Sequence, residues 1–161
     1  MNTTAQSHTQ PTTLPVDAHC FDEKLQLTNV AEYGISMQEL MSGRIGPPPE
    51  GARFDIAYEG RIEGARLSGM IEGVDYARVR ADGRFELDIR ARIVTDDGVP
   101  IALYADGILK APDLNGVAEV RLNMEMTTST PEYAWVNNLQ VWGSGTVNLE
   151  TGQIRVSTYV A

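Results

Sequence analysis

Two side chains in the second half of the chain have the spacing of a general acid and a general base. Tyr104 and Asp106 are two residues apart in PIALYADG, residues 100–107, so on a strand both point to the same face. Their Cα atoms would lie about 7 Å apart, which suits proton transfers at opposite ends of a small substrate. The alternative is an exposed tyrosine followed by an aspartate that forms a turn before Gly107.

Asp88 and Arg90 form a second pair with this spacing. If they face a cavity, Asp88 is a further candidate for catalysis, and Arg90 can bind a carboxylate or a phenolate. The alternative is a solvated ion pair across the strands, which contributes little stability. Glu59 and Glu125 are single carboxylates. Buried in an apolar cavity, either would have a raised pKa and could act as a base near neutral pH.

The segment YAWVN, residues 133–137, supplies candidate binding groups. On a strand, Trp135 and Asn137 share a face, where an indole wall lies beside an amide that both donates and accepts hydrogen bonds. The predicted catalytic residues are therefore Tyr104, Asp106, Glu125 and Asp88. The predicted substrate-binding residues are Arg90, Trp135, Asn137, Tyr133 and Glu59, and no metal ligand is predicted.

Alternating residue types predict the strands that would position these groups. From Phe85 to Ile93, apolar and charged side chains alternate with a period of two, which would scatter the apolar groups around a helix. Asp-Gly and Glu-Gly pairs separate such segments as tight turns. We expect strands at about 18–27, 53–59, 67–71, 76–80, 84–94, 101–106, 117–127, 133–149 and 154–160. Ser36 is expected to cap one helical turn, and the proline-rich residues 43–51 form an irregular loop.

Eight to ten strands with at most one short helix predict an all-β fold, a single antiparallel β-barrel. Closure removes exposed strand edges, and about eight strands leave room for side chains or one small ligand. A two-sheet sandwich is the alternative. We expect a disordered N-terminal tail over residues 1–16, which has few apolar groups, and the barrel over residues 17–161. Either face of each strand could point inward.

The net charge and the cysteine content indicate which classes of binding partner and which cellular compartment to expect. The formal net charge of −9 disfavours nucleic acid and anionic membrane surfaces, because both would repel the chain. The single cysteine, Cys20, excludes an intramolecular disulfide and suits the reducing cytoplasm. We find no spacing typical of a metal site and no nucleotide-binding loop. We therefore expect a cytoplasmic protein without a cofactor that binds a small hydrophobic molecule.

The chain carries several short motifs: GxxEGxxLxG at residues 60–69, GVDY at 73–76, DG at 82–83, LDxR at 87–90, TDDG at 95–98 and YAWVN at 133–137. Together they resemble the domain-of-unknown-function family 3237 of small bacterial and fungal β-barrels. The resemblance covers about residues 53–160. It implies a calycin-like or lipocalin-like barrel that is often oligomeric, so a homodimer or homotetramer is expected.

The residues leave acid–base chemistry by Asp, Glu and Tyr as the enzymatic hypothesis. We hypothesise a cofactor-independent lyase or isomerase acting on a small hydrophobic cyclic or aromatic metabolite inside the barrel. Tyr104 would be the acid and Asp106 or Glu125 the base, with Arg90 and Asn137 holding an oxyanion. The alternatives are a non-catalytic carrier barrel and a structural module whose interior is filled with side chains.

Overall fold

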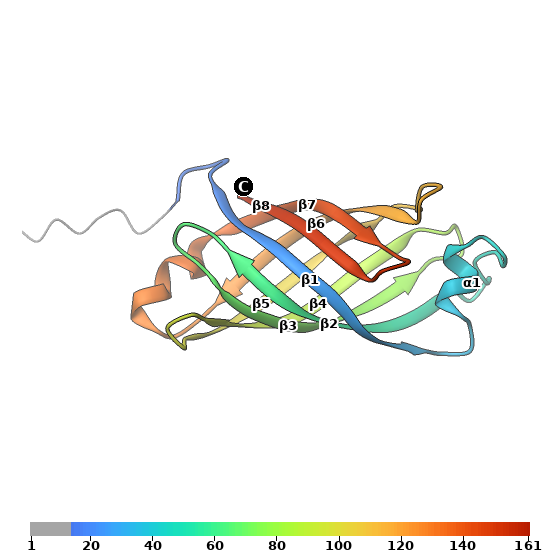
Figure 1. Ribbon diagram of the computed structural model, residues 1–161, viewed down its shortest axis with the longest axis horizontal. Coiled ribbons are helices and arrows are strands. Elements are labelled where there is room, and N and C mark those ends of the chain that lie inside the picture. Colours follow the sequence, from blue (N-terminus) through green and yellow to red (C-terminus); the bar gives the residue numbers. More distant parts are fainter. Residues whose placement is uncertain (1–13) are drawn as a thin grey trace, which may run out of the picture.

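Eight antiparallel strands close into one barrel in the computed structural model, which describes residues 14–161 (Figure 1). The strands follow one another in chain order, and β8 pairs with β1 to close the sheet. This confirms the predicted barrel and excludes the sandwich. The predicted tail lies almost entirely outside the described residues. The strands are β1 (His19–Glu32), β2 (Ala52–Glu63), β3 (Gly69–Val79), β4 (Phe85–Thr95), β5 (Pro100–Leu109), β6 (Val117–Thr127), β7 (Gln140–Asn148) and β8 (Gln153–Val160).

Two short helices lie at opposite ends of the barrel (Figure 1). The first is α1 (Met37–Met41), where Ser36 caps the helix as predicted by accepting a hydrogen bond from the Glu39 N–H. The second is the 3₁₀ helix η1 (Pro131–Asn138). Neither helix, nor any other in residues 14–161, is long and apolar enough to cross a membrane.

Two predicted boundaries are wrong. A single long strand was expected over residues 133–149, but its first part is η1, which begins at a proline whose fixed φ suits a helical first turn. The Glu72-Gly73 pair was expected to form a turn, but it lies inside β3. Gly73 is directly opposite Tyr58 of β2, so this glycine serves packing rather than chain reversal.

The apolar face of each strand points into the barrel. On β4, Phe85, Leu87, Ile89 and Ile93 are buried, as the alternation allowed. At the η1 end the interior is filled with side chains that are fully buried, namely Phe21, Ile62, Ile93, Ile101, Val136 and Val141. The half of the barrel nearer α1 is packed less completely, and the candidate site lies there.

Close approach of the backbones predicts a strong effect at Gly107 in β5. A Cβ atom there would overlap the carbonyl oxygen of Arg121 on β6. We expect Gly107→Ala to lower the free energy of unfolding by about 1–3 kcal/mol, as overpacking of a well-packed site does. Urea denaturation measures the change. Gly46→Ala is the matched control, because a Cβ atom there meets nothing within 4 Å. Equal stability of the two variants would contradict the described register.

Candidate functional site

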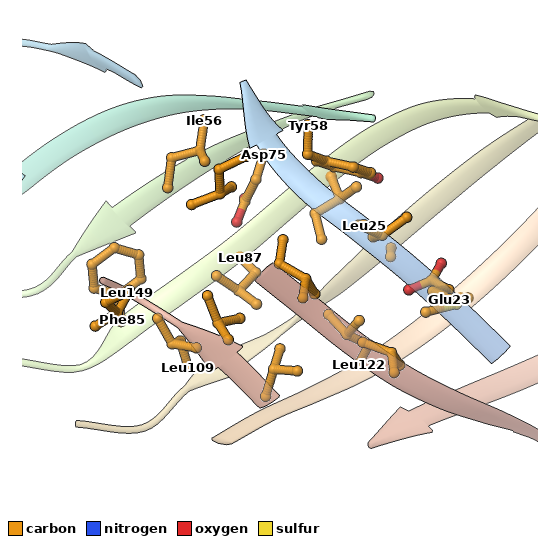
Figure 2. A pocket seen from close by; sticks show the side chains of 18 of the residues that line it. Glu23, Leu25, Ile56, Tyr58, Asp75, Phe85, Leu87, Leu109, Leu122 and Leu149 are labelled. Carbon is orange, nitrogen blue, oxygen red and sulfur yellow. The ribbon is translucent and has the colours of Figure 1, made fainter. Parts of the chain in front are cut away.

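The barrel holds an internal cavity of about 80 Å³ in the half nearer α1. Its wall is apolar except for three side chains, Glu23 from β1, Tyr58 from β2 and Asp75 from β3 (Figure 2). Every strand contributes to the wall, and Asp75 is the only contribution from β3. In Figure 2, Glu23 lies at the opposite end of the cavity from Phe85 and Leu149. The cavity is thus an apolar space with polar groups at a few points, as in many small-molecule sites.

Glu23 points into the barrel because it is in phase with Phe21 and Leu25 on β1. Its side chain is buried, with 4% of its surface exposed, and no hydrogen bond from residues 14–161 reaches its carboxyl group. Every side-chain oxygen of residues 14–161 that is fully enclosed by protein has a hydrogen-bond partner. Because the Glu23 oxygens have none, they are not fully enclosed and border the cavity. Burial raises the pKa of Glu23 to about 7. This carboxyl group therefore gains and loses its proton near neutral pH.

Asp75 is held by an interruption in the sheet. Pairing between β3 and β4 lapses between Asp75–Ile89 and Arg78–Glu86. In this gap the backbone N–H of Asp88 donates to Asp75 Oδ1 at 2.9 Å. Burial raises the pKa of Asp75 to about 7; the Asp88 N–H opposes this shift, and the Asp88 charge adds to it. Asp75 thus keeps a fixed orientation and a pKa close to that of Glu23.

Tyr58 lies across the space that Gly73 leaves open. A Cβ atom at Gly73 would be 2.8 Å from the Tyr58 hydroxyl oxygen, so a larger residue there would displace the phenol. Burial raises the pKa of Tyr58, and the charges of Glu23 and Asp75 raise it further. The phenol therefore stays protonated at neutral pH and can donate a hydrogen bond inside the cavity.

The cavity borders an outer depression at the α1 end of the barrel. Met37 of α1 and Leu149 line both the cavity and this depression. None of the α1 residues is buried, and Gly34 and Gly43, on either side of it, adopt positive φ angles of 88° and 74°. Met37 and Leu149 therefore lie between the cavity and this depression.

The first group of predicted site residues lies on the outer wall. Our functional hypothesis placed Asp88, Arg90, Tyr104 and Asp106 in the cavity, with an outward-facing position as the alternative. The structure has the outward-facing position, because alternation turns their apolar neighbours inward. Arg90 pairs with Asp88 at 2.8 Å and stacks 4.1 Å from the centre of the Tyr104 ring. Asp106 accepts a hydrogen bond from Asn123.

Glu59 and Glu125 are exposed on the same outer surface. Both carboxyl groups therefore contact solvent and lie outside the cavity. The principle that a buried carboxylate makes a base near neutral pH applies instead to Glu23 and Asp75. A chemical role for the outer-wall residues stays a prediction, and any such chemistry would take place outside the cavity.

The residues of the YAWVN motif lie on η1 at the closed end, not on a strand beside the cavity. Asn137 accepts from the Thr128 N–H and donates to the Thr128 carbonyl, both at 2.8 Å. The Tyr133 hydroxyl donates to Asp97 Oδ1 at 2.7 Å. Trp135 is buried beneath the guanidinium of Arg66, 4.1 Å away. These contacts fasten η1 over the end of the barrel.

A family comparison identifies the chain's relatives. Residues 26–160 match the family described as "Protein of unknown function (DUF3237)". The chain belongs to this family. The DUF3237 match includes Tyr58, Gly73 and Asp75, whereas Glu23 precedes it. It confirms the resemblance seen in the motifs. A comparison with curated proteins finds no match.

Solved structures share the barrel of this DUF3237 protein. A β-barrel-like protein from Acinetobacter baumannii is 23% identical, with a TM-score of 0.71 over 96% of this chain and 99% of its own. A conserved protein of unknown function from Rhodopseudomonas palustris is 21% identical, with a TM-score of 0.69 over 92% of this chain and 100% of its own. A Penicillium herquei protein described as an enzyme is 19% identical, with a TM-score of 0.64 over 92% of this chain and 98% of its own. These likenesses show the fold.

Burial of the carboxyl groups predicts how stability depends on pH. The pKa of Glu23 rises from 4.5 to about 7 on folding, so between these values the folded protein holds a proton that the unfolded chain has lost. Stability therefore falls as the pH rises through this window, and the loss is complete above it. Glu23 accounts for roughly 3 kcal/mol of this loss. Asp75 acts in the same direction.

Glu23→Gln removes the titrating group and keeps the shape of the side chain. Relative to the unmodified protein, this variant should gain roughly 2–3 kcal/mol of unfolding free energy between pH 5 and pH 8. Chemical denaturation at the two pH values measures the difference. Glu72→Gln, at an exposed position on the outer face of β3, is the control. An equal effect of Glu23→Gln at both pH values would show that Glu23 is not buried as described.

Proposed function

We propose that this DUF3237 protein is an enzyme that performs acid–base chemistry on a small, mainly apolar molecule in the barrel cavity. The reaction class is that of a cofactor-independent lyase or isomerase acting on a cyclic or aromatic metabolite. The observation that carries the proposal is the pair of buried carboxyl groups, Glu23 and Asp75. Both face one apolar cavity, and both have a pKa of about 7. Such pKa values suit groups that must exchange protons at physiological pH.

Asp75 and Tyr58 supply the proton transfer and the stabilisation of developing charge. The Asp75 carboxylate takes a proton from a carbon next to a carbonyl group, and the electron pair moves onto the carbonyl oxygen. The Tyr58 hydroxyl donates a hydrogen bond to that oxygen, an interaction that strengthens as negative charge develops. The protonated Asp75 returns the proton to another carbon, which completes an isomerisation with no net gain or loss of atoms.

The apolar wall supports this chemistry in two ways. It keeps both carboxyl groups out of bulk water, which holds their pKa values near neutrality. It also strengthens hydrogen bonds to a charged intermediate, because the local dielectric constant is low. The cavity of about 80 Å³ limits the substrate to a small molecule. An engineered apolar cavity of about 150 Å³ in another protein binds benzene, so a ring would require movement at Met37, an adaptable side chain.

The isomerisation of 3-cyclohexenone to 2-cyclohexenone tests the proposal. The product absorbs ultraviolet light as a conjugated enone, so a spectrophotometer follows the reaction without a coupled assay. We expect a rate above that of buffer, rising with pH through the pKa of Asp75. We expect Asp75→Asn to lower kcat/KM about a hundredfold or more. The asparagine can still accept the hydrogen bond from the Asp88 N–H, so the fold is preserved.

Two further variants show whether a loss of activity in Asp75→Asn is specific to the cavity. Asp82→Asn makes the same substitution in the exposed turn between β3 and β4 and should leave the rate unchanged. Asp106→Asn tests the outer wall; loss of activity there, with none in Asp75→Asn, would move the site to Tyr104 and Asp106. Binding of the ketone without any turnover above buffer would favour the carrier alternative, in which the apolar wall binds ligands and the carboxyl groups perform no chemistry.

A further inference from the structure

Glu23 is the least explained group in the cavity. It is buried at the end of the cavity away from Phe85 and Leu149, and no side chain or backbone group of residues 14–161 donates a hydrogen bond to it (Figure 2). Asp75, by contrast, accepts one from the Asp88 N–H. A buried carboxyl group without a partner costs stability, and a charged one costs more. The group that compensates Glu23 is therefore absent from the described part of the chain.

Among residues 14–161, no positively charged side chain lines the cavity. The titratable groups that face it are Glu23 from β1, Tyr58 from β2 and Asp75 from β3, and the lining from α1 and the other five strands includes no ionisable side chain. The neighbouring cations lie outside: Lys24 follows Glu23 on β1 but is exposed. Any charge that the cavity itself carries is therefore negative.

We propose that the ligand of this cavity is a small apolar amine whose ammonium group binds the carboxylate of Glu23. The inference rests on the proposed function only in placing the ligand in the same cavity. It assigns Glu23 to binding and leaves Asp75 and Tyr58 for chemistry. The substrate class becomes a cyclic or aromatic molecule that carries a basic nitrogen.

Charge distinguishes the possible ligands of this cavity sharply. An anionic ligand would place like charges together in an apolar space, where the repulsion is poorly screened. A neutral alcohol offers Glu23 one ordinary hydrogen bond. An ammonium group offers several donors and the opposite charge, and such charge-assisted hydrogen bonds are about twice as strong as neutral ones. Its apolar body would extend from Glu23 toward Phe85 and Leu149 (Figure 2).

Three molecules of one shape and different charge test the inference. Benzylamine, benzyl alcohol and benzoate are titrated into the full-length protein at pH 7.5, and isothermal calorimetry measures each Kd. We expect benzylamine to bind at least tenfold more tightly than benzyl alcohol, and benzoate not to bind. At pH 6.5, where Glu23 is partly protonated, binding of benzylamine should release protons, which calorimetry in buffers of different ionisation enthalpy counts.

Two variants test whether Glu23 causes the tighter binding of benzylamine. Glu23→Gln should weaken benzylamine binding at least tenfold and leave benzyl alcohol binding unchanged, whereas Glu72→Gln on the outer face of β3 should change neither. If Glu23→Gln leaves the preference for benzylamine intact, Glu23 is not its cause and the inference fails. Proton release that persists in Glu23→Gln would overturn it in the same way.

The remaining outcomes separate this inference from the proposed function. Equal affinity of benzyl alcohol and benzylamine would overturn selection by charge, while the cavity would remain a binding site for neutral molecules and the acid–base proposal would stand. If none of the three binds at millimolar concentration, the cavity does not accept ring-sized ligands. That result would overturn both the amine inference and the proposed function.

Discussion

Closure of the sheet by the pairing of β8 with β1 is the constraint on which the rest of the structure depends. The seam is irregular, since the register shifts between His19 and Phe21. Thr158 compensates for the shift: its hydroxyl accepts from the Phe21 N–H at 3.1 Å and donates to the Phe21 carbonyl at 2.7 Å. Once the seam is closed, every strand has two partners, and each side chain must point either into a small interior or outward.

This constraint makes the two buried carboxyl groups informative. In a closed barrel a polar side chain in phase with the apolar face cannot turn outward without a change of register. Glu23 and Asp75 therefore remain inside and raise the free energy of the folded state whenever they are charged. The fully packed half of the barrel, around Phe21 and Ile93, offsets this cost. The division of the interior into a filled half and a hollow half is what allows a reactive cavity in so small a protein.

The sequence predicted the fold well because strand alternation is a local property. It could also have located Glu23, since residues 21, 23, 25 and 27 alternate in step and the second of them is a glutamate among Phe21, Leu25 and Leu27. Our prediction instead chose the faces richest in charge, which alternation in a closed barrel places in solvent. Which face lies inside follows from closure, and closure depends on pairing between β1 and β8, more than 100 residues apart.

The other failures also come from interactions that no local pattern shows. The YAWVN segment is helical because Pro131 begins η1. The Asn137 side chain holds this helix against the barrel because the Thr128 N–H donates to it and the Thr128 carbonyl accepts from it. The orientation of Asp75 depends on a break in the β3–β4 ladder that frees the Asp88 N–H. Neither contact could be inferred from the spacing of residue types alone.

The GVDY motif shows how fold and chemistry are combined in one short segment of the family match. Gly73 makes room for the Tyr58 phenol, Asp75 enters the cavity two residues later, and Tyr76 lies outside, where the Arg53 guanidinium is 5.6 Å from the centre of its ring. A residue larger than glycine would displace Tyr58, whose hydroxyl group is the hydrogen-bond donor in our proposed function. The motif therefore does not mark a catalytic residue in isolation. It sets the position of Asp75 and of the Tyr58 hydroxyl together, because both depend on the same stretch of β3.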